Sequence, residues 1–382
     1  MNKLSRTKPY IPKEDHKEIL DRVADILNTE SLVQSKYVSE FENLFAKYCG
    51  TKYAVATCSG GTCLEVALRA SGLVGKKIIV PTQTFIASVS AIVRSNNIPV
   101  IVDIDENTHC LSADVIERSL DKDVAGVMLV HMAGYITPDY YNIKKLCDKH
   151  GLLLFEDASH AVGATIDNLH AGNLGYAGCF SLFATKIITT GEGGIITTND
   201  EKFAETCKTL RNHGAVRNPS PVNGVDFGVS CEFISSNYKM TEMVAALGIS
   251  QLKRVNEFVE KRNIIAKRYK EKITNPKIKF IDVPDNITNT WWHYIIELPR
   301  STTLNERSEI CKKLFLEYNI PTANAYWPAC HQQKVFEPYT VNQSYQSADG
   351  LLSRHLSIPM YVEMTMDQVD YVADVINKIV WL

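Results

Sequence analysis

The feature that most constrains the fold is an alternation of short apolar runs with segments of helical periodicity in the first half of the chain. Short apolar runs bounded by turn residues are typical of strands that are buried on both faces of a sheet. Strands that alternate with helices predict a mainly parallel sheet with crossover helices on its faces. The predicted strands are residues 77–80, 100–103, 124–130 and 152–156, and the predicted helices are residues 85–96, 112–120 and 139–150.

The second half of the chain predicts a different arrangement. Residues 240–272 keep a helical pattern for longer than a usual globular helix, which suggests a bridge between domains. The patterns beyond it predict strands at 278–283 and 293–298 and helices at 304–318 and 366–379. We therefore expect a large α/β domain with an N-terminal helical arm at 1–240, a long bridging helix at 241–272, and a small α+β domain at 273–382.

Lys186 is the strongest candidate for a catalytic group. A predicted apolar strand leads into a loop rich in Gly and Thr, which carries this lysine and continues to Gly194. A lysine in such a place is partly desolvated, and desolvation lowers the pKa of the amine and prepares it to form a Schiff base. The alternative is a surface lysine beside a hairpin turn, since charged side chains are mostly solvated.

Asp157 follows the apolar run at 152–156, so it lies at the carboxyl end of a predicted parallel strand. Open α/β sheets bind their ligands at this edge. A carboxylate there can pair with a protonated ring nitrogen, the arrangement that makes pyridoxal phosphate an electron sink. The alternative is that Asp157 caps the N-terminus of a helix, and the pattern alone does not separate the two interpretations.

The segment Ser59-Gly60-Gly61-Thr62 lies between a short predicted strand and a helical pattern. Backbone N–H groups at the start of such a helix point toward an anion in the turn, so the segment predicts a phosphate site. It matches neither the P-loop nor the GxGxxG fingerprint. The hydroxyl of Ser181 is a candidate for the same phosphate.

Further motifs follow these segments in order along the chain, at residues 81–88, 131–134, 156–160, 210–214, 236–242, 326–331 and 356–360. On these motifs, from about Tyr37 to the C-terminus, the chain resembles the sugar aminotransferases of the DegT/DnrJ/EryC1/StrS family, within the fold type I pyridoxal phosphate enzymes. The resemblance implies the α/β fold of that type, with a mainly parallel central sheet, flanking helices and a smaller C-terminal α+β domain.

The resemblance also implies the cofactor and its contacts. Pyridoxal 5'-phosphate would be bound, with pyridoxamine 5'-phosphate as its intermediate form. Lys186 would form the Schiff base and move protons during the reaction, and Asp157 would hold the pyridinium nitrogen. The other implied contacts are ring stacking by Phe85, a contact near the ring hydroxyl by His160, and phosphate contacts by Gly61, Thr62, Ser181 and, from a second subunit, Asn237. Because Asn237 would come from a second subunit, the resemblance also implies a homodimer with active sites at the subunit interface.

Two departures from the family pattern concern the phosphate and the substrate. The family usually has Ser or Thr at the position of Gly61, so Thr62 is the candidate to supply the missing hydroxyl. His331 lies in Cys-His-Gln-Gln, where the family more often has Leu-His. We expect His331 and Tyr326 to contact substrate. Trp291, Trp292 and Trp327 either stack on a base or sugar or pack in a core or interface.

The activity implied by the resemblance is transfer of an amino group from L-glutamate to a keto-sugar linked to a nucleotide, in amino-sugar and surface-polysaccharide biosynthesis. A small phosphorylated ketone or a cyclitol ketone is an alternative acceptor. A sugar dehydratase that uses the same cofactor and a non-catalytic regulatory protein that binds it are further alternatives. The presence of Lys186 argues against the dehydratase activity of the branch that carries histidine at this position.

A turn-rich stretch at 218–224 predicts a loop near the acceptor.

Composition is that of an ordinary enzyme: the chain has 382 residues, of which 45% are hydrophobic and 22% charged. A formal net charge of -2 gives no general attraction to nucleic acid or anionic membranes. No apolar run reaches the roughly 18 residues of a membrane span, and the N-terminus lacks the apolar stretch of a signal peptide, so we expect a cytoplasmic protein. The cysteines form no CxxC pair and the histidines no HExxH motif, so no metal site is expected.

Overall fold

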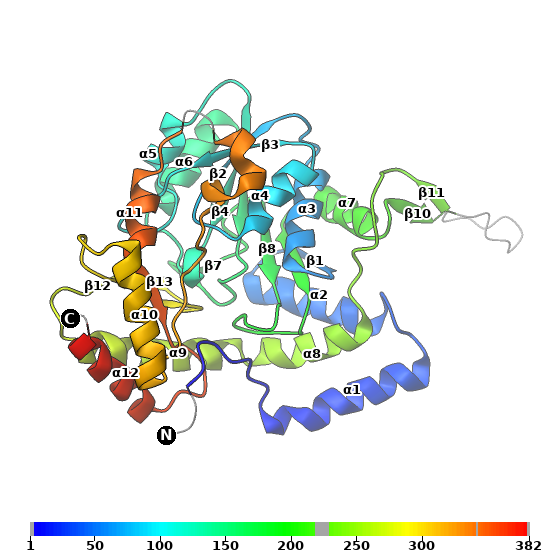
Figure 1. Cartoon of the computed structure of the whole chain (residues 1–382). Coiled ribbons are helices and arrows are strands. Elements are labelled where there is room, and N and C mark those ends of the chain that lie inside the picture. The colour runs from blue at the N-terminus through cyan, green and yellow to red at the C-terminus, as the bar shows by residue number, and fades with distance from the viewer. Residues whose placement is uncertain (1–3, 218–228, 341–342, 380–382) are drawn as a thin grey trace, which may run out of the picture.

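A seven-stranded sheet forms the centre of the structure, a computed structural model that describes residues 4–217, 229–340 and 343–379 (Figure 1). The strand order is β1-β9-β8-β5-β4-β2-β3; β9 is antiparallel to both of its neighbours, and the other adjacent pairs are parallel. The mainly parallel sheet predicted from the sequence is therefore confirmed. The strands are β1 (Tyr53–Thr57), β2 (Lys77–Pro81), β3 (Ile98–Val102), β4 (Val124–Val130), β5 (Leu153–Asp157), β8 (Ala177–Ser181) and β9 (Gly194–Thr198).

Both faces of the sheet are covered by helices. Successive residues of a strand point to opposite faces, so Ile78 and Val80 lie in one apolar cluster while Ile79 between them lies in the other. On one face lie α2 (Lys36–Cys49), α6 (Tyr140–His150) and α8 (Glu242–Lys253), and on the other lie α3 (Gly60–Ala70), α4 (Ile86–Arg94) and α7 (Glu201–Arg211).

The segment predicted as one long bridging helix consists of two helices in succession, α8 and α9 (Val255–Lys272). Arg254 joins them, and its guanidinium donates hydrogen bonds to Asp15 and Glu257. Helix α8 packs against α2, whereas α9 packs against the C-terminal helix α12 (Met366–Ile379). The segment thus connects the two parts of the molecule, and the boundaries of the predicted domains stay a prediction.

The C-terminal part has its own small sheet and core. Its three strands are antiparallel in the order β12-β14-β15, and their core includes Leu314, Leu356 and Val372. The elements are β12 (Lys279–Phe280), β14 (Tyr294–Glu297), α10 (Leu304–Tyr318), α11 (Gln346–Arg354), β15 (His355–Ile358) and α12.

The remaining elements are short or peripheral. They are α1 (His16–Thr29), α5 (Ala113–Arg118), β6 (Thr165–Ile166), β7 (Leu169–His170), β10 (Ala215–Arg217), β11 (Val229–Cys231) and β13 (Ile287–Thr288). The predicted loop at 218–224 lies outside the described residues. Within the described ranges, no helix has the length and apolar character needed to cross a membrane.

The sheet brings candidate site residues that are far apart in the sequence to one edge. Strands β1, β8, β5, β4 and β2 run in the same direction, so their carboxyl ends lie together. The start of α3, the carboxylate of Asp157 and the hydroxyl of Ser181 follow or end three of these strands. Lys186 lies in the turn between β8 and β9 at the same edge, which is where open α/β sheets bind their ligands.

Candidate active site

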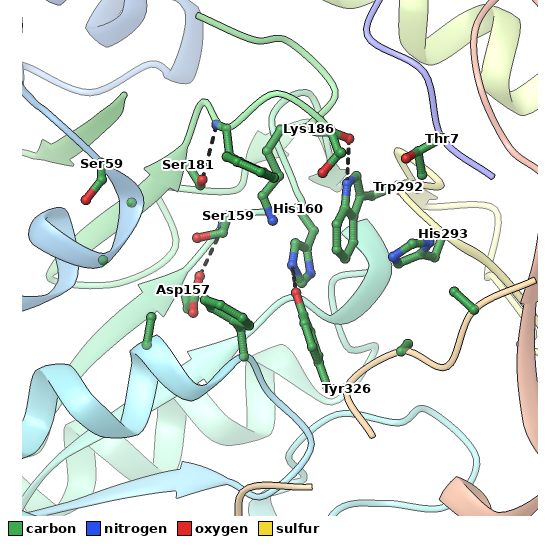
Figure 2. Close-up of a pocket in the computed structure, with 18 of the residues that line it drawn as sticks. Thr7, Ser59, Asp157, Ser159, His160, Ser181, Lys186, Trp292, His293 and Tyr326 are labelled. Atoms are coloured by element: carbon green, nitrogen blue, oxygen red, sulfur yellow. Dashed lines mark hydrogen bonds between the residues drawn. The ribbon is translucent and has the colours of Figure 1, made fainter. Parts of the chain in front are cut away.

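A cavity of about 540 Å³ opens at this edge (Figure 2). It is lined by residues of both parts of the chain, because Trp292 and Tyr326 of the C-terminal half face Lys186 and His160 of the first half. The predicted site residues that line it are Gly61, Phe85, Asp157, His160, Ser181, Lys186 and Tyr326. The fold therefore gathers most of the predicted site into one cavity.

Lys186 is partly buried in this cavity beside an aromatic ring. Its Nζ lies 4.0 Å from the ring centroid of Trp292, and the indole Nε1 of Trp292 donates a hydrogen bond of 2.8 Å to the carbonyl of Thr185. Burial lowers the pKa of Lys186 to about 8, although the nearby carboxylate of Asp157 raises it in part. The amine is thus far closer to neutrality at physiological pH than that of an exposed lysine.

Asp157 is the last residue of β5 and is held by two donors. The hydroxyl of Ser88 donates to Oδ2 at 2.6 Å, and the backbone N–H of Ser159 donates to Oδ1 at 3.1 Å. Ser88 is in turn fixed by Thr84, whose Oγ1 lies 2.7 Å from the Ser88 hydroxyl. The residues that follow Asp157 form turns and no helix. The carboxylate therefore caps no helix and faces the cavity.

The N-terminus of α3 approaches β8 very closely. A Cβ atom on Gly60 would lie 2.6 Å from the Cβ of Ser181, so only glycine fits without a shift of the backbone. Gly60, Gly61 and Ser181 all line the cavity. The hydroxyl of Ser181 thus lies beside the first amides of α3, and the N–H groups of a helix start have no partner within the helix.

His160 lies in a stack of three rings. Its imidazole is 3.9 Å from the ring of Trp292 at an interplanar angle of 12°, and Tyr326 stacks at 5.6 Å. The Nε2 of His160 lies 2.5 Å from the phenol oxygen of Tyr326. Burial, and secondarily the charge of Lys186, hold the pKa of His160 well below its usual value, so the imidazole is neutral.

A profile of the DegT/DnrJ/EryC1/StrS aminotransferase family matches residues 13–377. The chain belongs to the DegT/DnrJ/EryC1/StrS aminotransferase family. The resemblance given by the sequence motifs is thereby confirmed.

Individual relatives of this aminotransferase match over nearly their whole lengths. The spore coat polysaccharide biosynthesis protein SpsC of Bacillus subtilis is 34% identical over 385 residues, which cover 97% of both chains. The GDP-perosamine synthase of Caulobacter vibrioides is 31% identical and covers 99% of this chain and 100% of its own. The solved structure of Helicobacter pylori PseC superposes with a TM-score of 0.90 over 100% of both chains, at 24% identity, and so supports the fold.

Thr62 of this aminotransferase does not line the cavity. Its backbone N–H is bound to the hydroxyl of Ser59 at 3.2 Å, and its own hydroxyl accepts the N–H of Ser59 at 3.1 Å. Together these bonds form a capping box at the start of α3. In the structure both groups are used by the cap, and a phosphate contact by Thr62 stays a prediction.

His331 also lies away from the cavity wall. Its Nδ1 lies 2.6 Å from the Thr82 hydroxyl, its Nε2 lies 3.0 Å from Asp349, and its ring stacks on Tyr345 at 4.1 Å. These contacts hold the imidazole in a structural cluster beside the end of β2. The structure thus does not bring His331 to the place predicted for a substrate contact.

Asn237 is exposed and is absent from the cavity of its own chain. Its side-chain Oδ1 accepts the backbone N–H of Lys239 at 3.3 Å. A phosphate contact by this side chain requires a second subunit and stays a prediction.

Several lining residues were not predicted as site residues. Arg6 and Thr7 come from the N-terminal segment, while His293 and Asn324 come from the C-terminal part. Ser88, which fixes Asp157, was also missed. For Trp292 the sequence left open whether it stacks on a base or sugar or packs in a core or interface, and in the structure it packs against Lys186 and His160.

Proposed function

We propose that this aminotransferase binds pyridoxal 5'-phosphate and transfers an amino group from L-glutamate to a nucleotide-linked keto-sugar, in the biosynthesis of an amino sugar for a surface polysaccharide. The names of two relatives support the acceptor class, since one makes a GDP-linked amino sugar and the other acts in spore coat polysaccharide biosynthesis. The observation that carries the proposal is the partly buried amine of Lys186, with a pKa of about 8, in one cavity with Asp157.

The groups around the cavity fit this cofactor. The start of α3 and the hydroxyl of Ser181 suit its phosphate, and Asp157 suits its ring nitrogen. Phe85 is 53% exposed at the cavity although it is strongly apolar, as expected of an aromatic side chain that covers a ligand ring. The Nδ1 of His160 is buried without a hydrogen-bond partner among the described residues, so a polar ligand group can satisfy it.

Pyridoxal phosphate, when bound, supplies an aldehyde for an amine and a ring that accepts the electron pair of a broken bond. Lys186 would hold the group through its amine, and its Nζ would move a proton between atoms in the cavity. Asp157 would pair with the ring nitrogen, and the donors Ser88 and Ser159 fix the orientation of the carboxylate. Trp292 closes one side of the Lys186 amine against water.

The neutral imidazole of His160 contributes hydrogen bonds and no charge. The pKa of Tyr326 is raised well above its usual value by burial, so its phenol keeps its proton and can donate to Nε2 of His160. That bond leaves the hydrogen of the imidazole on Nδ1. His160 is thereby set to donate from Nδ1 to an oxygen of the bound ring.

We further propose that the active unit is a homodimer with shared sites. Asn237 is exposed and lies outside the cavity of its own chain. A symmetric pair of chains would let each Asn237 complete the phosphate site of its partner.

The experiment that tests this function is a turnover assay with defined substrates. Cofactor-loaded protein is incubated with L-glutamate and, in turn, with GDP-, UDP- and dTDP-linked keto-sugars, and the products are identified by mass spectrometry. We expect 2-oxoglutarate and an amino sugar in equal amounts with one acceptor, and neither with Lys186→Ala. Absence of amino sugar from every keto-sugar, with 2-oxoglutarate formed against other ketones, would refute the proposed acceptor class.

A further inference from the structure

The N-terminal segment is fixed against the C-terminal part of the chain. Leu4 is 7% exposed within the apolar core around α12, and the backbone carbonyl of Arg6 accepts the N–H of Met360 at 3.1 Å. Lys8 forms an ion pair with Glu363 at 2.5 Å. The backbone on both sides of Arg6 is therefore held in place before any ligand binds.

This fixed segment forms part of the cavity wall. Arg6 and Thr7 line the cavity, and Figure 2 shows Thr7 on the side of Trp292 and His293, away from the start of α3. The proposed phosphate site of the cofactor thus lies at one end of the cavity and the N-terminal segment at another. The segment is placed to contact a substrate.

Arg6 carries the one guanidinium on the described part of the cavity wall. Its side chain has no hydrogen bond or ion pair with any residue in the ranges 4–217, 229–340 and 343–379. Arg268 and Arg354, two arginines of the C-terminal part, instead form ion pairs with carboxylates. A guanidinium without a partner, on a backbone that is held in place, is available to an anionic ligand.

Among the described residues, no side chain of the cavity wall forms an ion pair with Arg6. The side chain of His293 is buried, and burial together with the charges of Arg6 and Lys186 lowers its pKa to about 3, so it is neutral. The cavity wall also includes Ala323, Ala325 and Asn324, and the Oδ1 of Asn324 is buried and lacks a partner in the described structure. The two carboxylates of the wall are Asp157, held by Ser88 and Ser159, and Glu192 beside the Lys186 loop.

We propose that Arg6 is a specificity-determining residue that binds an anionic group of a substrate, either the carboxylate of the amino donor or the diphosphate of the nucleotide. The proposal rests on the proposed function, because that function requires each substrate to carry such an anion. A guanidinium presents parallel N–H groups that match the paired oxygens of carboxylate or phosphate.

The test measures ligand binding and does not depend on turnover. Cofactor-loaded wild-type protein and the variants Arg6→Gln and Arg6→Lys are titrated by calorimetry with GDP, UDP and dTDP, and separately with glutarate, which lacks the amino group. Lys8→Gln is the matched control, because Lys8 is a basic residue of the same segment that does not line the cavity. Its ion pair with Glu363 is at the surface and contributes little, so Leu4 and the bond between Arg6 and Met360 still hold the segment. Thermal unfolding of each variant shows whether the fold is kept.

We expect Arg6→Gln to weaken binding of one probe class by about ten- to a hundredfold. Arg6→Lys should lose part of the affinity, and Lys8→Gln none. Loss confined to the nucleotides assigns the diphosphate, and loss confined to glutarate assigns the donor carboxylate. The inference is overturned if Arg6→Gln binds both classes like wild type, or if wild type binds neither.

The experiments distinguish a failure of this inference from a failure of the proposed function. Binding that depends on Arg6 in a protein that does not transaminate would keep the inference and refute the function. An active aminotransferase whose Michaelis constants and probe affinities do not respond to Arg6→Gln would refute only the inference.

Discussion

The protonation of Lys186 is decided by two opposed effects of its surroundings. Loss of solvation in the cavity disfavours the ammonium form, while the carboxylate of Asp157 favours it, and the loss of solvation is the larger effect. With a pKa of about 8, about a tenth of the side chains are neutral at pH 7, compared with well under a thousandth for an ordinary lysine. The site therefore holds an amine that can react near neutral pH.

A pH profile of cofactor capture tests this balance. Only the neutral amine attacks an aldehyde, so the rate at which cofactor-free protein captures pyridoxal phosphate should rise with pH through a midpoint near 8 and level off above it. Asp157→Asn removes the effect that raises the pKa, so its midpoint should move to lower pH. Stopped-flow absorbance gives both curves. A midpoint near that of free lysine, or an upward move in Asp157→Asn, would contradict the account.

At the scale of residues, the sequence predicted the groups that do chemistry better than the groups that support them. Lys186 and Asp157 could be predicted because each follows a strand whose apolar pattern is local. Trp292, His293 and Arg6 could not, because they reach the cavity only when segments distant in the sequence pack together. The capping box that uses the hydroxyl and amide of Thr62 could not be predicted, because the local pattern does not show which partners these groups take.

At the scale of elements, the junction of α3 with β8 controls the proposed phosphate site. The helix can approach the strand because Gly60 has no side chain, and this contact sets the first amides of α3 beside Ser181. Gly61, the next residue, has room for a methyl group, since its added Cβ would lie 3.7 Å from Ala87. Two adjacent glycines thus have different roles.

Alanine substitutions distinguish these roles. Gly60→Ala places a Cβ 2.6 Å from that of Ser181 and should cost about 1–3 kcal/mol of unfolding free energy through overpacking. Gly61→Ala should be neutral or stabilising by up to about 1 kcal/mol, because alanine favours a helix. Urea unfolding of the cofactor-free proteins measures both. Equal stability of the two variants would show that the contact between α3 and β8 is loose.

Elements with strong periodicity were predicted well. The strand at 124–130 and the helices at 304–318 and 366–379 have the predicted bounds in the structure. The strand predicted at 278–283 is shorter, since only Lys279 and Phe280 pair with β14. The reversed direction of β9 was not predicted, because the direction of a strand in a sheet depends on its neighbours.

At the scale of the whole molecule, the proposed dimer explains why Asn237 is exposed. If each Asn237 completes the site of the partner subunit, a variant that lacks Lys186 and a variant that lacks Asn237 carry defects in complementary places. Mixing them would create heterodimers in which one site has both wild-type residues.

A subunit-mixing experiment follows from this arrangement. Lys186→Ala should be inactive and Asn237→Ala should bind the cofactor weakly. A refolded equal mixture should regain about a quarter of the wild-type sites, which is the share that random pairing of two-fold dimers gives. Activity at limiting cofactor measures the recovery. No recovery above the sum of the two variants would place Asn237 outside the partner's site.

The central claim is that Lys186 carries the cofactor covalently. The most direct measurement is reduction of the loaded protein with borohydride, followed by proteolysis and mass spectrometry of the peptides. The account predicts one peptide with the added mass of the reduced cofactor, with the modification on Lys186, and no such peptide from Lys186→Arg. A modification on another lysine, or none on Lys186 in fully loaded protein, would contradict it.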